Sequence, residues 1–217
     1  MFCLVLDLVA WGQSHNGSIQ GMVLDRSGHA IGRASVTWRD VSLQEKEVEV
    51  MAGAVPTVIA DSTGAFTIPG LELGHRYKVY ASKENENYPD MTMGLYNPKD
   101  DAVIAEAGAA GESNVAVQLG PKAARLKWSV TDATTGTGVL PVLVVQRVDS
   151  GGGLEGRFPG VSELLIPADV EIRIEVSADG YDIWYYPGST AKSAPVPLQM
   201  KAGEVRTINV QLARTNQ

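Results

Sequence analysis

Residues 170–178, Val-Glu-Ile-Arg-Ile-Glu-Val-Ser-Ala, give the clearest indication of the fold. Apolar and polar side chains alternate along them without a break, which is typical of a strand with one face on a core and the other in water. The same period of two recurs in residues 18–23, 34–39, 76–81, 114–119, 125–130 and 207–212. No stretch of a dozen residues shows helical periodicity, so the sequence predicts an all-β protein of half-buried antiparallel strands.

Turn signals separate these strands. Residues 25–28 (Asp-Arg-Ser-Gly) and 61–64 (Asp-Ser-Thr-Gly) each begin with Asp and end with Gly. The Asp side chain can accept backbone N–H bonds within such a turn, and Gly tolerates a positive φ. We therefore read these carboxylates, and those of Asp100 and Asp101, as turn-forming and solvated groups rather than calcium ligands.

Short words of the sequence occur twice. Phe66-Thr67-Ile68-Pro69 is echoed by Leu164-Leu165-Ile166-Pro167, and Val117-Gln118-Leu119 by Val210-Gln211-Leu212. This repetition predicts two tandem domains of one kind, residues 15–120 and 121–217, joined near Gly120-Pro121. Because the junction has almost no spare residues, we expect a restrained pair.

Two stretches resemble a known family. Residues 21–36 (GMVLDRSGHAIGRASV) and 61–71 (DSTGAFTIPGL) resemble the opening and the central turn of a carboxypeptidase regulatory-like domain. The second half departs from the pattern, because residues 160–164 replace the Asp-x-x-Gly-x-Phe turn, but it keeps a Gly180-Tyr181 pair. The resemblance implies two tandem antiparallel Greek-key β-sandwiches, transthyretin-like or immunoglobulin-like in form. It also implies a secreted, periplasmic or outer-membrane bacterial protein in which such domains are non-catalytic accessories.

The first 14 residues have the character of a processed leader. Residues 1–10 are apolar except for Asp7, and Ala10 and Gly12 stand at the −3 and −1 positions of a signal-peptidase site. The missing basic start indicates a signal peptide truncated at its N-terminus; the alternative is a first β-strand. Cleavage would remove Cys3, the single cysteine of the chain, so the sequence predicts a secreted or periplasmic protein without disulfides.

Composition excludes several classes. The chain has 217 residues, 44% of them apolar, and a net charge of −7. The apolar content excludes wholesale disorder, and the acidic balance argues against a nucleic-acid partner. No apolar run reaches the roughly 18 residues of a spanning helix, so no transmembrane segment is expected in the mature chain.

Little in the sequence points to catalysis. Ser189-Thr190-Ala191-Lys192 has the SxxK spelling of penicillin-recognising enzymes, but it stands in a Pro- and Gly-flanked loop without the partner motifs. His15, His29 and His75 are isolated and lack metal-ligand spacing. We therefore expect no catalytic residues, no metal, no cofactor and no enzyme activity.

A Lys–Asn isopeptide bond is a further chemical possibility. Lys127 and Asn209 lie in the first and last strands of the second half, but each stands between inward-facing apolar residues. Both side chains should therefore point to solvent, away from the buried setting that this reaction needs.

The aromatic residues at 181–187 are the best ligand candidates. Tyr181, Trp184, Tyr185 and Tyr186 crowd one short segment, in which successive side chains of an extended chain point to opposite sides. Exposed Trp and Tyr suit stacking on sugar rings and protein interfaces alike. The alternative is that the rings cap the open end of the sandwich core.

Together these patterns predict an exported, non-catalytic accessory protein. It would act as a binding or spacer module at the bacterial surface or in the periplasm, with a protein or polysaccharide partner at the cell envelope. The alternative is a carbohydrate-binding, starch-binding-like module that uses the four aromatic residues of the 181–187 segment.

Overall fold

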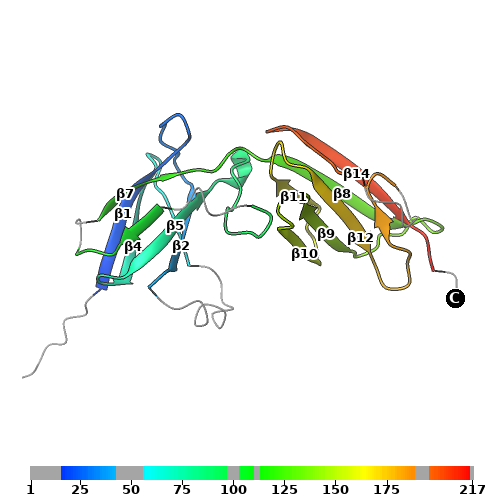
Figure 1. Ribbon diagram of the computed structural model, residues 1–217, viewed down its shortest axis with the longest axis horizontal. Coiled ribbons are helices and arrows are strands. Elements are labelled where there is room, and N and C mark those ends of the chain that lie inside the picture. Colours follow the sequence, from blue (N-terminus) through cyan, green and yellow to red (C-terminus); the bar gives the residue numbers. More distant parts are fainter. Residues whose placement is uncertain (1–15, 43–55, 97–102, 110–112, 189–195, 216–217) are drawn as a thin grey trace, which may run out of the picture.

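A computed structural model of the chain describes residues 16–42, 56–96, 103–109, 113–188 and 196–215 (Figure 1). The predicted leader, His15, Asp100, Asp101 and the SxxK segment at 189–192 lie outside the described residues. Among the described residues, no helix is long and apolar enough to cross a membrane.

The first half of the described chain forms seven strands and one short 3-10 helix, η1 (Glu84–Glu86). The strands are β1 (Asn16–Leu24), β2 (Ser35–Asp40), β3 (Thr57–Ile59), β4 (Ala65–Glu72), β5 (Arg76–Ser82), β6 (Val103–Glu106) and β7 (Asn114–Gln118).

Seven more strands follow in the second half. They are β8 (Ala124–Asp132), β9 (Val142–Arg147), β10 (Gly153–Arg157), β11 (Glu163–Ile166), β12 (Ile172–Ser177), β13 (Trp184–Tyr185) and β14 (Val205–Leu212). Residues 170–178 contain β12, which pairs with β9 on one side and β13 on the other.

The two halves repeat one topology. The first half has the sheets β4-β1-β7 and β3-β2-β5-β6, and the second has β11-β8-β14 and β10-β9-β12-β13. Each strand of the second half takes the place of the strand seven positions earlier. The structure thus confirms the predicted fold class, an all-β pair of tandem sandwiches, which lie end to end in Figure 1. The domain boundary at Gly120-Pro121 stays a prediction.

One strand pair in each half runs parallel. β1 pairs with β7, with Gly21 opposite Val115, and β8 pairs with β14, with Trp128 opposite Ile208. The other strand pairs are antiparallel. Alternation of apolar residues has the same period of two in both arrangements, so the sequence pattern does not carry the direction of pairing.

The apolar residues of each half gather between its two sheets. Ile19, Val36 and Val117 lie in the first core, and Leu126, Ile174 and Val210 lie in the second. Gly21 faces the first core as well, and a Cβ there would lie 2.2 Å from the Val115 carbonyl oxygen and 2.7 Å from the Phe66 ring. Only glycine lets β7 and Phe66 approach β1 so closely.

The Asp-containing turns form as expected. Asp61 accepts hydrogen bonds at Oδ1 from the Thr63 N–H (2.7 Å), the Thr63 hydroxyl (2.7 Å) and the Ala65 N–H (3.0 Å). Asp25 likewise accepts from the N–H groups of Ser27 and His29. These bonds satisfy backbone donors at each bend and fix the chain reversals after β1 and before β4.

Candidate functional site

The predicted aromatic segment lies beside β12 at the edge of its sheet. β13 places Trp184 opposite Val176 and Tyr185 opposite Glu175. Trp184 is buried in the second core and meets Tyr186 edge to face, with ring centroids 6.4 Å apart. Tyr185 and Tyr186 are half-buried. The largest ring therefore belongs to the core, and the ligand-binding role of these residues stays a prediction.

Tyr181 belongs to a different group of contacts. Its hydroxyl donates to Oδ2 of Asp132 (2.9 Å), and Arg214 Nε donates to the same oxygen (2.8 Å). The Arg214 guanidinium also lies 5.5 Å from the centre of the Tyr181 ring. Asp132 Oδ1 accepts from the N–H groups of Thr134 and Thr135, each at 2.8 Å. This network ties the segment after β14 to the turn after β8.

The Asp132 carboxylate is the one charged or polar side chain among the described residues that is fully buried. The Thr135 N–H lowers its pKa well below the ordinary value; burial opposes this shift, while the Thr134 N–H, Tyr181 and Arg214 add to it. A carboxylate with four donors is stable without water. We therefore interpret Asp132 as a structural anion that closes one end of the second sandwich.

His75 forms a second polar cluster, in the first sandwich. Its Nδ1 lies 2.8 Å from Oδ2 of Asp40, and its Nε2 lies 2.9 Å from Oε2 of Glu72. The hydrogen bond with Asp40 raises the pKa of His75; burial opposes this shift, and the charges of Asp40 and Glu72 add to it. The sequence showed His75 only as an isolated histidine, because its contacts with the ends of β2 and β4 form in the folded chain.

Lys127 and Asn209 lie on the outer face of the β11-β8-β14 sheet, and both are exposed, as predicted. Lys127 is opposite Thr207 in the register, and Asn209 accepts a 2.7 Å hydrogen bond from the Ser129 hydroxyl. The two side chains are thus not placed for an isopeptide bond. No group of three or more metal-ligating side chains occurs within the described ranges.

The junction between the sandwiches is built by residues 84–96, called here the junction segment. It comprises η1 and the chain that follows it, after β5 of the first sandwich. Lys83, just before it, donates to the Gly32 carbonyl oxygen (2.7 Å) and pairs with Glu86 (2.7 Å), which fastens the segment to the first sandwich. Tyr88 lies in the first core.

The rest of the junction segment packs into the second sandwich. Met91, Leu95 and Tyr96 belong to the same buried cluster as Leu126 and Trp128. At Gly94 a Cβ would lie 2.8 Å from the Gly153 carbonyl oxygen, so the segment backbone lies directly against the start of β10. One segment thus supplies side chains to both cores.

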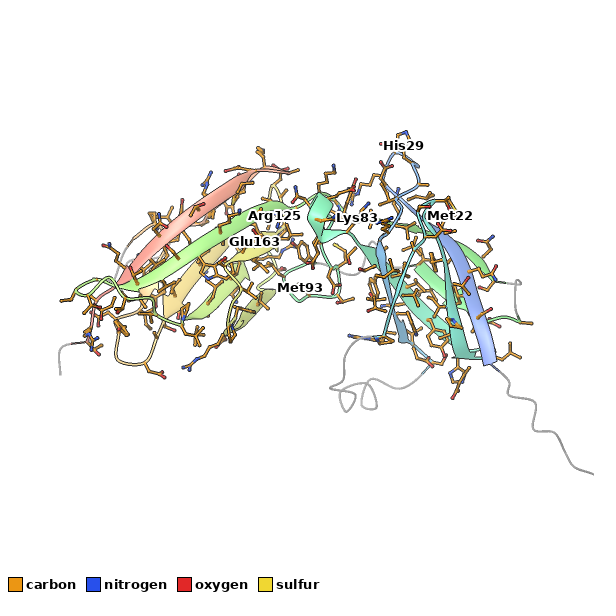
Figure 2. The ribbon with its side chains drawn as sticks, turned by 180° about the vertical axis from the view of Figure 1, so that it is seen from behind. Met22, His29, Lys83, Met93, Arg125 and Glu163 are labelled. Carbon is orange, nitrogen blue, oxygen red and sulfur yellow. The ribbon has the colours of Figure 1, made fainter. Side chains whose placement is uncertain are left out.

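Arg125 links the junction segment to the second sandwich by polar contacts. Its Nη2 donates to the Glu84 carbonyl oxygen (2.9 Å) and to Oδ1 of Asn87 (2.8 Å), while Nη1 pairs with Glu163. The Ala123 N–H donates to the Asn87 carbonyl oxygen (2.8 Å). Figure 2 shows Arg125 and Glu163 beside the junction, with Lys83 on its other side. A planar guanidinium with three acceptors holds its neighbours in one geometry.

The role of the junction segment was not predicted from the sequence. A signal was present: residues 88–96 contain five large apolar or aromatic side chains. So many apolar side chains in a loop indicate that another part of the molecule covers the loop. The sequence alone did not show that the second sandwich covers it.

The chain was compared with models of protein families and with curated proteins. No protein-family model matches it, and no curated protein does either. The resemblance to carboxypeptidase regulatory-like domains therefore stays a prediction.

Several solved structures are similar to the chain. The TIE protein of Bacillus anthracis is 15% identical with a TM-score of 0.35, over 93% of this chain and 34% of that one. A streptococcal ancillary pilin is 13% identical with a TM-score of 0.40, over 94% and 64%. A shaft pilin of Lactobacillus rhamnosus GG is 11% identical with a TM-score of 0.33, over 94% and 98%. The chain thus spans less than two thirds of the first two proteins.

Proposed function

We propose that this protein is a non-catalytic, exported structural spacer that holds two sandwich domains, residues 15–120 and 121–217, in one relative orientation. The junction segment carries this proposal. It contributes Tyr88 to one core and Met91, Leu95 and Tyr96 to the other. A connection that is buried on both sides cannot swing freely without exposing apolar surface to water.

The polar clusters support a structural role. The four donors around Asp132 and the two carboxylates around His75 close chain ends and turns of the sandwiches. Each of these groups is engaged by its neighbours, which is the arrangement of a stabilising network rather than of a poised nucleophile and base. Location at the bacterial surface or in the periplasm is part of the proposal and rests on the leader-like residues 1–14.

Residual dipolar couplings test the spacer proposal. We expect the backbone couplings of both sandwiches to fit a single alignment tensor in the intact protein. Arg125→Ala removes the polar link at the junction and should worsen that fit. Arg173→Ala is the matched control, because Arg173 is exposed on β12 and its side chain forms no hydrogen bond or ion pair within the described part of the chain. Two independent tensors for the unaltered protein would show that the proposal is wrong.

The carbohydrate-binding alternative also remains a proposal. Trp184 is buried, so Tyr185 and Tyr186, which are half-buried, are the rings best placed to reach a sugar. If the alternative holds, a glycan array will give binding that Tyr185→Ala abolishes and Tyr88→Phe, in the first sandwich, leaves intact. A silent array would contradict it.

A further inference from the structure

A cleft of about 260 Å³ opens where the junction segment meets the second sandwich. Pro89, Met93 and Tyr96 line it from the junction segment, and Phe158, Val161 and Leu164 line it from the second sandwich. Figure 2 shows Met93 facing the same region as Glu163 and Arg125. The lining is mostly apolar, and Val161 is 48% exposed, so a large apolar side chain would gain by entering.

A polar group in this lining lacks a partner. Tyr96 is only 5% exposed, and its hydroxyl has no hydrogen-bond partner among the described residues. An unpaired buried hydroxyl is costly, and a ligand that supplies a partner would remove that cost. The group is therefore a candidate contact for an occupant of the cleft.

The charges at the mouth of the cleft are unbalanced. Glu163 is paired with Arg125 and with Lys127. Glu84 and Asp90 also line the cleft, and neither carboxylate forms an ion pair within the described chain. Both lie close enough to Tyr96 to raise the pKa of its hydroxyl further, beyond the larger effect of burial. Two carboxylates beside an apolar cleft favour a cationic group.

One wall of the cleft is an open strand edge. β11 is the outermost strand of its sheet and pairs with β8 alone. The Trp128 N–H donates to the Ser162 carbonyl oxygen. Because hydrogen-bonded residues alternate along an antiparallel pair, the backbone N–H and C=O groups of Leu164 and Ile166 are the next ones that face β8. The backbone groups of Glu163 and Leu165 therefore point away from β8, where they can pair with another extended chain.

We propose that this cleft binds an extended segment of a partner protein that pairs with the free edge of β11. The segment places an apolar side chain over Phe158 and Leu164 and a Lys or Arg side chain beside Glu84 and Asp90. Backbone pairing with β11 requires a polypeptide, and the two carboxylates of Glu84 and Asp90 select the basic residue. The proposal goes beyond the spacer proposal, because the walls of the cleft come from the junction segment and the second sandwich alone.

Short synthetic peptides test the proposal on the intact protein. The probe is acetyl-Thr-Lys-Thr-Leu-Thr-amide, in which Lys and Leu lie on one side of an extended chain. One control has Glu in place of Lys, and another has Pro in place of the central Thr, which removes a backbone donor. We expect saturable shifts of the Glu163, Leu165 and Tyr96 amide signals in two-dimensional NMR with the Lys peptide, and at least about fivefold weaker binding of both controls.

Variants of the protein identify the charged groups. We expect Glu84→Gln combined with Asp90→Asn to weaken binding of the Lys peptide about tenfold. Asp90→Asn keeps the oxygen that accepts the Thr92 N–H and hydroxyl, so the turn is preserved. The matched control is Glu106→Gln, an exposed carboxylate on β6 outside the cleft, which should leave affinity unchanged. Tyr96→Phe should weaken binding several-fold.

The outcomes separate this proposal from the spacer proposal. Equal binding of the Lys and Glu peptides, shifts away from the cleft, or no saturable shift at millimolar peptide would each overturn the partner site. If a single alignment tensor accompanies such a result, the spacer proposal stands while the partner site falls. If two tensors are needed but charge-dependent binding at β11 persists, the spacer proposal falls and the partner site stands.

Discussion

At the scale of single residues, His75 is a group whose protonation is linked to folding. It lies between Asp40 and Glu72, whose carboxylates favour the charged imidazolium. The folded-state pKa lies above the ordinary value of 6.5, so the folded protein binds this proton more tightly than the unfolded chain does. Its contribution to stability is therefore complete below pH 6.5 and is lost as the pH rises through the folded-state pKa.

We predict that His75→Gln lowers the free energy of unfolding in mildly acidic buffer and that the difference from the unaltered protein vanishes by about pH 9. Urea unfolding across this range measures the effect. His29→Gln is the control, because His29 is exposed and its one carboxylate contact is 3.4 Å long. A difference that stays constant with pH would contradict the prediction.

Asp132 has the opposite dependence on pH. Its pKa is lowered, chiefly by the Thr135 N–H, so its contribution is complete above the ordinary value of 3.8. The contribution is lost as the pH falls from there through the folded-state pKa.

We predict that Asp132→Asn melts at a lower temperature than the unaltered protein at neutral pH. The amide nitrogen of Asn is a hydrogen-bond donor, and it would face groups that donate to the carboxylate of Asp132. The difference in melting temperature between the two proteins should narrow as the pH falls below about 4. Calorimetry measures both effects. Asp179→Asn changes an exposed carboxylate of the same sandwich and should alter melting little. A gap that widens in acid would be inconsistent with this account.

Local sequence identified some of these residues and not others. Asp61 was predictable because its bonding partners are Thr63 and Ala65, within four residues of it. The network around Asp132 was not predictable in this way, since Tyr181 and Arg214 lie 49 and 82 positions away from it in the sequence. Contacts within a turn follow from spacing, whereas contacts between distant segments follow from the packed fold.

At the scale of elements, the strands were the best predicted feature. β8, β12 and β14 coincide with alternating stretches of the sequence, because a strand that faces a core needs an apolar side chain at every second position. The parallel pairing of β1 with β7 and of β8 with β14 was not predictable from that pattern. The direction of pairing depends on which neighbours the connections bring together.

The junction segment is the element whose role only packing reveals. Leu95 is completely buried in the second core, although its segment follows β5 of the first sandwich. We predict that Leu95→Ala lowers the free energy of unfolding by about 3 kcal/mol, because it leaves a cavity in a well-packed site. Chemical denaturation followed by tryptophan fluorescence measures this loss.

Leu73→Ala is the matched control for that experiment. Leu73 is 48% exposed, so the same truncation there should change stability by less than about 0.5 kcal/mol. Equal losses at the two positions would mean that Leu95 is not in the core.

At the scale of the whole molecule, the second sandwich depends on residues from the first half of the chain. Met91, Leu95 and Tyr96 complete its buried cluster and lie before the predicted boundary at Gly120-Pro121. A fragment of residues 121–217 would leave the apolar side chains that meet them exposed to water.

We therefore predict that the isolated fragment 121–217 unfolds at a lower urea concentration than the same sandwich does in the intact chain, and that it binds a hydrophobic dye. The fluorescence of Trp128 and Trp184 reports the transition in both samples, with Trp11 and Trp38 replaced by Phe in the intact chain. Coincident transitions would show that the two halves are stable independently and that the junction contributes nothing.

The sequence by itself determined the fold class and the tandem repeat, because a period of two and Asp-Gly turns are local properties that each segment expresses alone. It also indicated a restrained junction from the lack of spare residues at Gly120-Pro121. The tertiary structure decided which residues form that junction, the burial of Trp184 and the cleft beside β11. These features arise where segments far apart in the chain meet, and their contacts exist only once both sandwiches have folded.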